Sequence, residues 1–263
     1  MSLWMVSRIP PLLLLILLVL VIAGGAVLIQ RLVRGRFPQL RQDAHNDVTK
    51  FAYGVIGFVY AFFIGFVVSA MWGQIGNADA KARIEGAAGV QLAKDMRVFD
   101  KADRDRLSQS LIDFENAALT EWPLAASGQA YPEADQALQR LYDAYIQIKP
   151  QNQAQTTFLG TAFTNLDKIS QARTERVLQA RTDIGPPWSL WAVIFLTSGL
   201  VLGCAIIYGV EKPAMHYPMV ATVGVLVAAN FFLVLQLAHP YVGEMATSPE
   251  PLREAVHVLT ASY

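Results

Sequence analysis

Four apolar runs constrain the fold more than any other feature of this sequence. They cover about residues 12–29, 51–72, 188–210 and 217–238, and a helix needs about 20 apolar residues to cross a bilayer. Composition points the same way, because 54% of the 263 residues are hydrophobic and only 16% are charged, whereas soluble domains carry roughly 25% charged residues. The sequence therefore predicts a multi-pass membrane protein whose first partner is the lipid bilayer.

The first run also has features of a secretory signal peptide, since Arg8 precedes it. Its unbroken apolar core, residues 12–29, is longer than the roughly 7–15 residues of a typical signal-peptide core, and arginines follow it directly. We expect a retained anchor.

A polar segment, residues 74–186, separates the second run from the third. Apolar residues recur there at helical spacing, and no strand-like alternation of useful length occurs. The helices predicted within it cover residues 81–121, 133–148 and 153–182. The sequence thus predicts an all-α membrane protein in which two transmembrane hairpins, residues 1–73 and 187–263 with a C-terminal tail, flank an extramembrane helical layer.

A Glu121-Trp122-Pro123 corner is expected within this layer. Proline removes a helical hydrogen bond and clashes with the preceding turn, so Pro123 should end the helix before it. Trp122 should fill the space where the layer's helices meet, because a large aromatic ring buries much apolar area.

Several function classes find no support in the sequence. The 21 basic residues balance the 21 acidic ones, which argues against a nucleic-acid partner. The single cysteine, Cys204, lies in an apolar run, and the four histidines stand in no metal-binding motif. No nucleophile with a neighbouring base is apparent, so we expect no enzyme, no metal and no cofactor.

The second run carries two stripes with a four-residue period. Its small residues are Gly54, Gly57, Ala61, Gly65 and Ser69. Phe58, Phe62 and Phe66 lie one position further around the helix. Small residues permit close helix packing in lipid, and the phenylalanines are candidates for an apolar constriction around an oligomer axis. The pattern alone leaves open whether the stripes only pack or also line a pore.

Polar residues in the fourth run also have two interpretations. Asn230 and Gln236 lie among apolar neighbours, where each would either make an interhelical hydrogen bond or line a pore. His239 follows at the expected interface, where it would cap the helix end or sense pH.

Three motifs resemble the bacterial bestrophin-like family over about residues 45–259. They are HNDVTKFAYGVIGFVYAFFIGFVV, which starts with His45 and Asn46, the EWP of residues 121–123, and HPYVGEMATSPEPL, which contains His239, Pro240 and Gly243. Bestrophins are pentameric anion channels whose second membrane helix lines the pore. The resemblance therefore implies a homo-oligomer, with five subunits as the first number to test, that passes small inorganic ions such as chloride.

Two features depart from bestrophins. The dense acidic calcium clasp is missing, since the corresponding region offers only Glu244, Glu250 and Glu254. Bestrophins also place the helical layer in the cytoplasm. Here the basic residues that join the first two spans would by the positive-inside rule lie in the cytoplasm themselves and put the layer outside; they are Arg31, Arg34, Arg36, Arg41 and Lys50.

These observations predict an ion channel of the bacterial inner membrane with its second transmembrane helix at the pore. The alternative is a non-conducting membrane scaffold whose helical layer binds a partner. A secondary transporter ranks third, because no inverted repeat or paired broken helices are visible.

Overall fold

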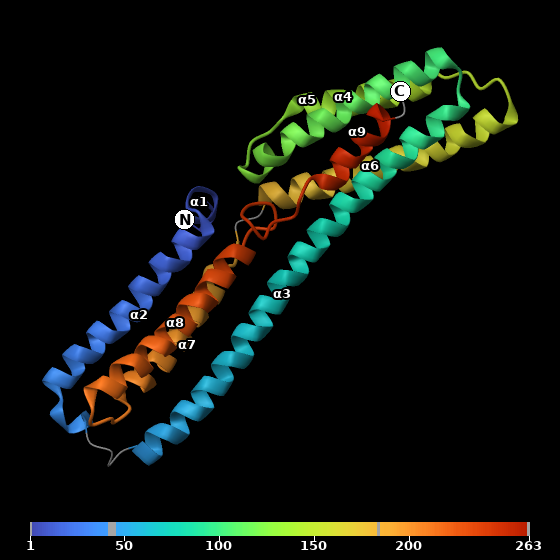
Figure 1. The fold of residues 1–263 in the computed structure, drawn as a ribbon. Coiled ribbons are helices and arrows are strands. Elements are labelled where there is room, and N and C mark those ends of the chain that lie inside the picture. Colours follow the sequence, from blue (N-terminus) through green and yellow to red (C-terminus); the bar gives the residue numbers. More distant parts are fainter. Residues whose placement is uncertain (1, 42–45, 183–184, 262–263) are drawn as a thin grey trace. The chain divides into compact units, whose positions relative to one another are not determined.

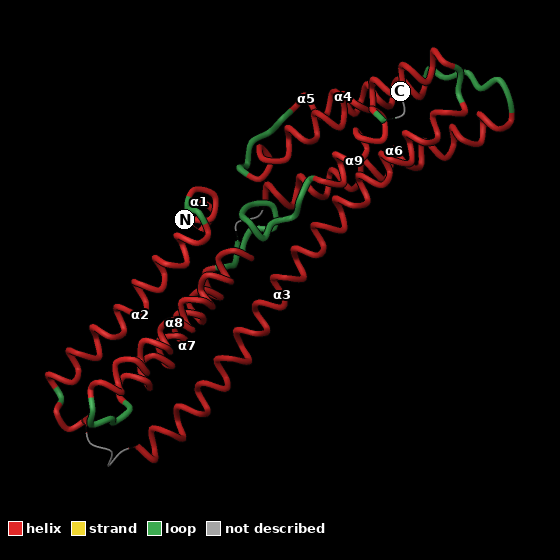
Figure 2. Tube along the Cα trace, viewed as in Figure 1, coloured by secondary structure: helices red, strands yellow, loops and turns green. Residues whose placement is uncertain are grey.

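The computed structural model describes residues 2–41, 46–182 and 185–261. Within these residues every regular element is a helix and no strand occurs (Figure 2). In chain order (Figure 1) the α-helices are α1 (Ser2–Arg8), α2 (Pro11–Arg36), α3 (Asn46–Asp95), α4 (Lys101–Ala126), α5 (Pro132–Ile146), α6 (Gln153–Thr182), α7 (Trp188–Ile207), α8 (Pro213–Leu237) and α9 (Glu250–Thr260). The all-α prediction is confirmed.

Four of these helices, α2, α3, α7 and α8, are long and apolar enough to cross a membrane. Tertiary contacts divide the chain into two compact units. The membrane unit comprises residues 1–73, 184–239 and 243–245, and the helical layer comprises residues 74–183, 240–242 and 246–263. Helix α9 is therefore part of the layer and not a tail of the membrane unit.

Helix α3 is longer than the sequence indicated, because the second span and the start of the layer form one helix of 50 residues. At 1.5 Å per residue it is about 75 Å long, more than twice the ~30 Å hydrocarbon core of a bilayer. No proline interrupts residues 73–95, so nothing stops the helix where the apolar run ends.

The helix predicted over residues 81–121 is wrong as a single element. Helix α3 ends at Asp95, a 3₁₀ turn covers Met96–Val98, and α4 begins at Lys101. The Asp100 carboxylate accepts the Asp103 backbone N–H at 2.9 Å and caps the new helix, which is the usual N-cap arrangement.

The expected stop at Pro123 is also wrong, since α4 continues through it to Ala126. A proline this near the C-terminal end removes only one helical donor. The helix ends one turn later, where Gly128 takes a positive φ of 79° that suits glycine best. By contrast, α6 matches the predicted range 153–182.

In the membrane unit α2 packs along α8 and also touches α7, while α7 packs on α8. The closest approach joins α8 to α2: a Cβ added at Gly224 would lie 2.6 Å from the Cα of Ala23. The small-residue packing seen inside the subunit therefore involves α2 and α8, a pair that the α3 pattern did not indicate.

The helical layer has its own apolar core. Helix α4 contributes Leu107, Leu111 and Phe114, all fully buried, and it packs against α5, α6 and α9. Amphipathic faces on these helices bury against one another, which supplies most of the stability that short helices lack on their own.

Candidate pore face and buried charge network

The membrane half of α3 has one buried face. Tyr60, Ile64, Val67 and Met71 are all buried and recur at the three- and four-residue spacing of a helix face. This face therefore holds α3 against the rest of its own subunit.

The phenylalanine stripe lies elsewhere on the same helix. Phe58, Phe62 and Phe66 are 73%, 72% and 69% exposed. Burying a phenylalanine contributes about 1.5–3 kcal/mol, so three such side chains in a row favour an environment of lipid or of another subunit. They are free to meet neighbours outside the subunit.

The small-residue stripe also points away from the subunit. A Cβ added at Gly54, Gly57 or Gly65 would have no atom within 4 Å, and Ala61 and Ser69 are exposed. The predicted close packing therefore does not involve another span among the described residues of this chain.

The hydroxyl of Tyr60 joins α3 to two other spans. It lies 3.3 Å from Asn230 Nδ2 of α8 and 3.4 Å from Ser198 Oγ of α7, and both groups donate to it. Asn230 thus makes an interhelical hydrogen bond in this structure. Gln236 is fully buried, and neither of its amide atoms has a hydrogen-bond partner among the described residues.

A polar cluster connects the C-terminal ends of α2 and α7 with the N-terminal end of α8. Arg34 of α2 donates to the carbonyl oxygens of Val210 at 2.7 Å and Glu211 at 2.9 Å. It also lies 2.9 Å from Nδ1 of His216, whose Nε2 is 3.2 Å from the Ala205 carbonyl oxygen. Because arginine only donates, Nδ1 must accept, so Nε2 carries the proton and donates to Ala205.

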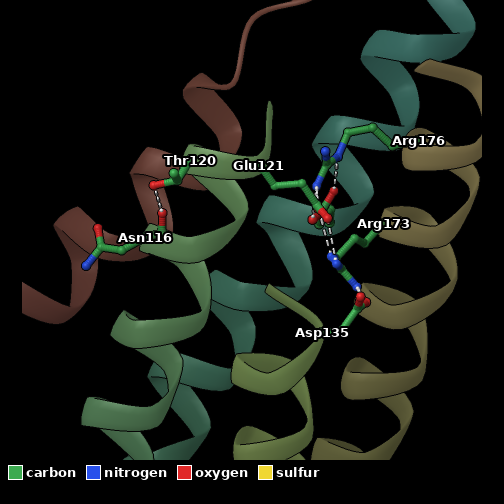
Figure 3. A network of polar contacts seen from close by, with 7 residues as sticks. Asn116, Thr120, Glu121, Asp135, Arg173 and Arg176 are labelled. Carbon is green, nitrogen blue, oxygen red and sulfur yellow. Dashed lines mark hydrogen bonds and ion pairs between the residues drawn. The ribbon is translucent and has the colours of Figure 1, made fainter. Parts of the chain in front are cut away.

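The helical layer contains a buried network of opposite charges (Figure 3). Arg173 of α6 makes a two-pronged pair with Glu121 of α4, at 2.9 and 2.7 Å, and donates to Asp135 of α5 at 2.8 Å. Burial alone lowers the pKa of Arg173, but the hydrogen bonds and charges of Glu121 and Asp135 outweigh burial and raise it. The pair therefore stays ionised.

Arg176, one turn further along α6, repeats this arrangement. It makes a two-pronged pair with Glu85 of α3 at 2.8 and 3.0 Å, and its Nη2 lies 3.6 Å from Glu121 Oε2. Its guanidinium carbon stands 4.8 Å from the centre of the Trp122 ring, within the range of a cation–π contact. Together the two arginines join α3, α4, α5 and α6.

Comparison with known proteins gives this architecture a family. The family model for a bestrophin-like domain matches residues 19–252, which is most of the chain. The chain belongs to the bestrophin-like family. The resemblance that the three motifs indicated is thereby confirmed.

Solved bestrophin-like structures share the fold. A variant of a bacterial bestrophin homolog from Klebsiella pneumoniae gives a TM-score of 0.67 at 15% identity, over 95% of this chain and 99% of that chain. The same homolog phased from zinc gives 0.64 at 14% identity, over 95% and 97%. A crystal structure described as a membrane protein gives 0.70 at 14% identity, also over 95% and 97%. No curated protein matches the chain.

The bestrophin-like motif near the C-terminus has residues in both units, and His239 and Gly243 belong to the membrane unit. His239 is buried, with Nε2 3.1 Å from the Ser2 hydroxyl oxygen. Gly243 has a φ of 108°, and a Cβ there would lie 2.7 Å from Val6. The carbonyl oxygen of Pro240 accepts the Thr247 backbone N–H at 2.8 Å within the layer.

The first motif is only partly covered by the structure. His45 lies outside the described residues, and Asn46 is the first residue of α3. Among the described residues no three or more His, Cys, Asp and Glu side chains gather to hold a metal ion.

Sequence reasoning missed the two arginines of the layer, although a signal was present. Ile169 and Val177 are buried on α6, and Arg173 and Arg176 lie between them among the buried residues of the same helix. A charge on an otherwise apolar face indicates a buried ion pair. The spacing gives no hint of the partners, which lie 52 residues away for Glu121 and 91 for Glu85.

Proposed function

We propose that this bestrophin-like protein is one subunit of a homo-oligomeric ion channel, with α3 lining the pore and anions as the conducted ions. The observation that carries the proposal is the outward phenylalanine face of α3, beside a buried face that anchors the same helix. A pore of this kind needs neighbours, because the phenylalanines point away from their own subunit.

The phenylalanines supply the gate in this proposal. Rings of Phe58, Phe62 and Phe66 around an axis would form an apolar constriction, and such constrictions control conduction by drying and wetting. Five subunits are the first number to test, by analogy with bestrophins. The small-residue stripe of α3 would then face the neighbouring subunit, where its open Cβ positions allow close approach.

Basic residues near one end of the membrane helices support anions as the ions, with chloride as the first to test. Arg31 and Arg36 near the end of α2, Lys50 near the start of α3 and Lys212 before α8 are exposed. A charged mouth raises the local concentration of counter-ions. Under the positive-inside rule the same residues favour a helical layer on the non-cytoplasmic side of the inner membrane.

Truncating the central phenylalanine tests the proposal. Phe62→Ala widens the constriction and should give faster chloride flux than the parent protein in sealed liposomes, because a wider and less apolar ring holds water more readily. Leu196→Ala is the control, since it shortens another exposed apolar residue, on α7, and should leave flux unchanged.

Gly65→Leu separates assembly from conduction. No atom of the subunit lies within 4 Å of a Cβ at Gly65, so any loss of the oligomer reports a contact between subunits. Native mass spectrometry would measure the assembly. If Phe62→Ala forms an intact oligomer that leaks no faster than empty vesicles, the pore proposal fails and the scaffold hypothesis takes its place.

A further inference from the structure

Glu115 of α4 is a carboxyl group with no partner in the interior of the layer. The residue is fully buried, and neither carboxylate oxygen has a hydrogen-bond partner among the residues that the structure describes. Its Oε1 would be 2.3 Å from a Cβ added at Gly89 of α3, and Ala255 of α9 would be 3.1 Å from that same Cβ. The carboxyl group therefore lies where α3, α4 and α9 meet.

The two buried arginines of the layer are paired with other carboxylates. Arg173 forms ion pairs with Glu121 and Asp135. Arg176 forms ion pairs with Glu85 and Glu121. Burial raises the pKa of Glu115 well above its ordinary value, the charge of Glu85 raises it further, and Arg176 lowers it only in part.

Among the described residues, Arg176 is the cation whose charge lowers the pKa of Glu115. Helix α5 contributes another buried acidic group to the core of the layer, Tyr145, whose hydroxyl has no partner among the described residues and whose pKa is raised by burial. Helix α9 presents Ala255 to the junction, and its own ionisable residues are exposed; these are Glu250, Arg253, Glu254 and His257. A charged carboxylate at position 115 would thus be buried with only the partial compensation that Arg176 gives, which is unfavourable.

Two glycines of α3, Gly86 and Gly89, form the surface on which α9 packs. A Cβ at Gly86 would lie 2.1 Å from the Pro251 carbonyl oxygen, so the backbone of α9 touches that of α3 there. One turn on, Gly89 makes room for Ala255 and for the Glu115 carboxyl group. Helix α9 has 11 residues and buries only Leu252, Ala255 and Leu259. A short helix with few buried residues is expected to detach locally at a lower free energy than the rest of the core.

We propose that the proton on Glu115 holds α9 against α3 and α4, and that the loss of this proton to solvent at alkaline pH releases α9. Ionisation requires water to reach the carboxyl group, and lifting α9 from Gly89 would admit it. The inference concerns the layer alone and holds whether or not the protein conducts ions.

The expected pH dependence follows from proton linkage. The docked state keeps the proton over a pH range in which the opened state has lost it, so the opening equilibrium constant of α9 should rise up to tenfold per pH unit. The rise begins above the ordinary pKa of a glutamate and stops at the raised pKa of the docked state.

Hydrogen exchange of the α9 amides measures this opening. The full-length protein in detergent is compared with Glu115→Gln at the same pH, from pH 6 to 9, so that the chemical exchange rate and the titration of His257 cancel. Asp113→Asn is the matched control, because Asp113 lies on α4 but is exposed and accepts only from Gln109.

The parent protein and Asp113→Asn should lose protection in α9 as pH rises, whereas Glu115→Gln should keep it. Glu115→Leu provides a second neutral variant in case the amide is not tolerated, and it should show the same flat profile. Equal protection of the parent and the neutral variants at every pH would overturn the proposal, as would weaker protection of both neutral variants at pH 6.

Discussion

Trp122 is the residue at which the apolar and ionic interactions of the layer meet. Its ring is 7% exposed and lies edge-on to Tyr241, with the ring centres 5.7 Å apart. Arg176 covers it at 4.8 Å, and this arginine also binds Glu85. Removing the ring would leave a cavity and would take away the aromatic face that contacts the Arg176 guanidinium.

Trp122→Ala should therefore lower the free energy of unfolding of the layer by about 3–5 kcal/mol, as in other large-to-small changes in cores. Denaturant unfolding followed by circular dichroism measures the change. Ile146→Ala is the control, since Ile146 is exposed on α5 and surface substitutions stay within about 0.5 kcal/mol. Unchanged stability with lost activity would instead indicate that Trp122 belongs to a binding site.

Helices α2 and α8 of the membrane unit meet at a tight contact between Gly224 and Ala23. Gly224 leaves no room for a side chain, because a Cβ would stand 2.6 Å from Ala23 Cα and 2.9 Å from Ala23 Cβ. Backbone atoms at both sides cannot rotate out of the way. Helices that rely on van der Waals contact in lipid are sensitive to such a change.

Gly224→Ala should separate α2 from α8 and lower the thermal unfolding midpoint of the protein in detergent. Gly203→Ala on α7 is the matched control, since its Cβ would meet nothing within 4 Å. Alanine favours a helix over glycine by up to about 1 kcal/mol, so the control should be neutral or stabilising. Equal midpoints for the two variants would show that the α2–α8 contact relaxes freely.

The sequence revealed the elements where it contains strong local signals. Pro150 before α6 and Gly185-Pro186 after it bracket that helix, and its range was predicted correctly. The break between α3 and α4 was not, because Asp100 caps a helix within a stretch whose apolar spacing looks continuous. Glu115 was also missed, since a glutamate on an amphipathic helix carries no sign of burial until α3 and α9 are placed beside it.

At the scale of the whole molecule, the proposed orientation in the membrane rests on a few basic side chains. The connection between α2 and α3 supplied the argument for a layer outside the cytoplasm. Arg34 is buried and binds the carbonyl oxygens that follow α7, so its charge serves contacts between the membrane helices. Arg31, Arg36 and Lys50 remain exposed and still favour that side.

Labelling of single cysteines decides this orientation. Replacing Cys204 by serine removes the only thiol of the chain. Ser127→Cys then reports on the layer from an exposed position after α4, and Gln39→Cys reports on the connection after α2. With the layer outside, an impermeant thiol reagent should modify position 127 in intact spheroplasts and position 39 only after lysis, because exposed thiols on one side of the membrane alone meet the reagent. The opposite pattern would place the layer in the cytoplasm, as in bestrophins, and would show that the packing role of Arg34 and its neighbours outweighs their effect on insertion.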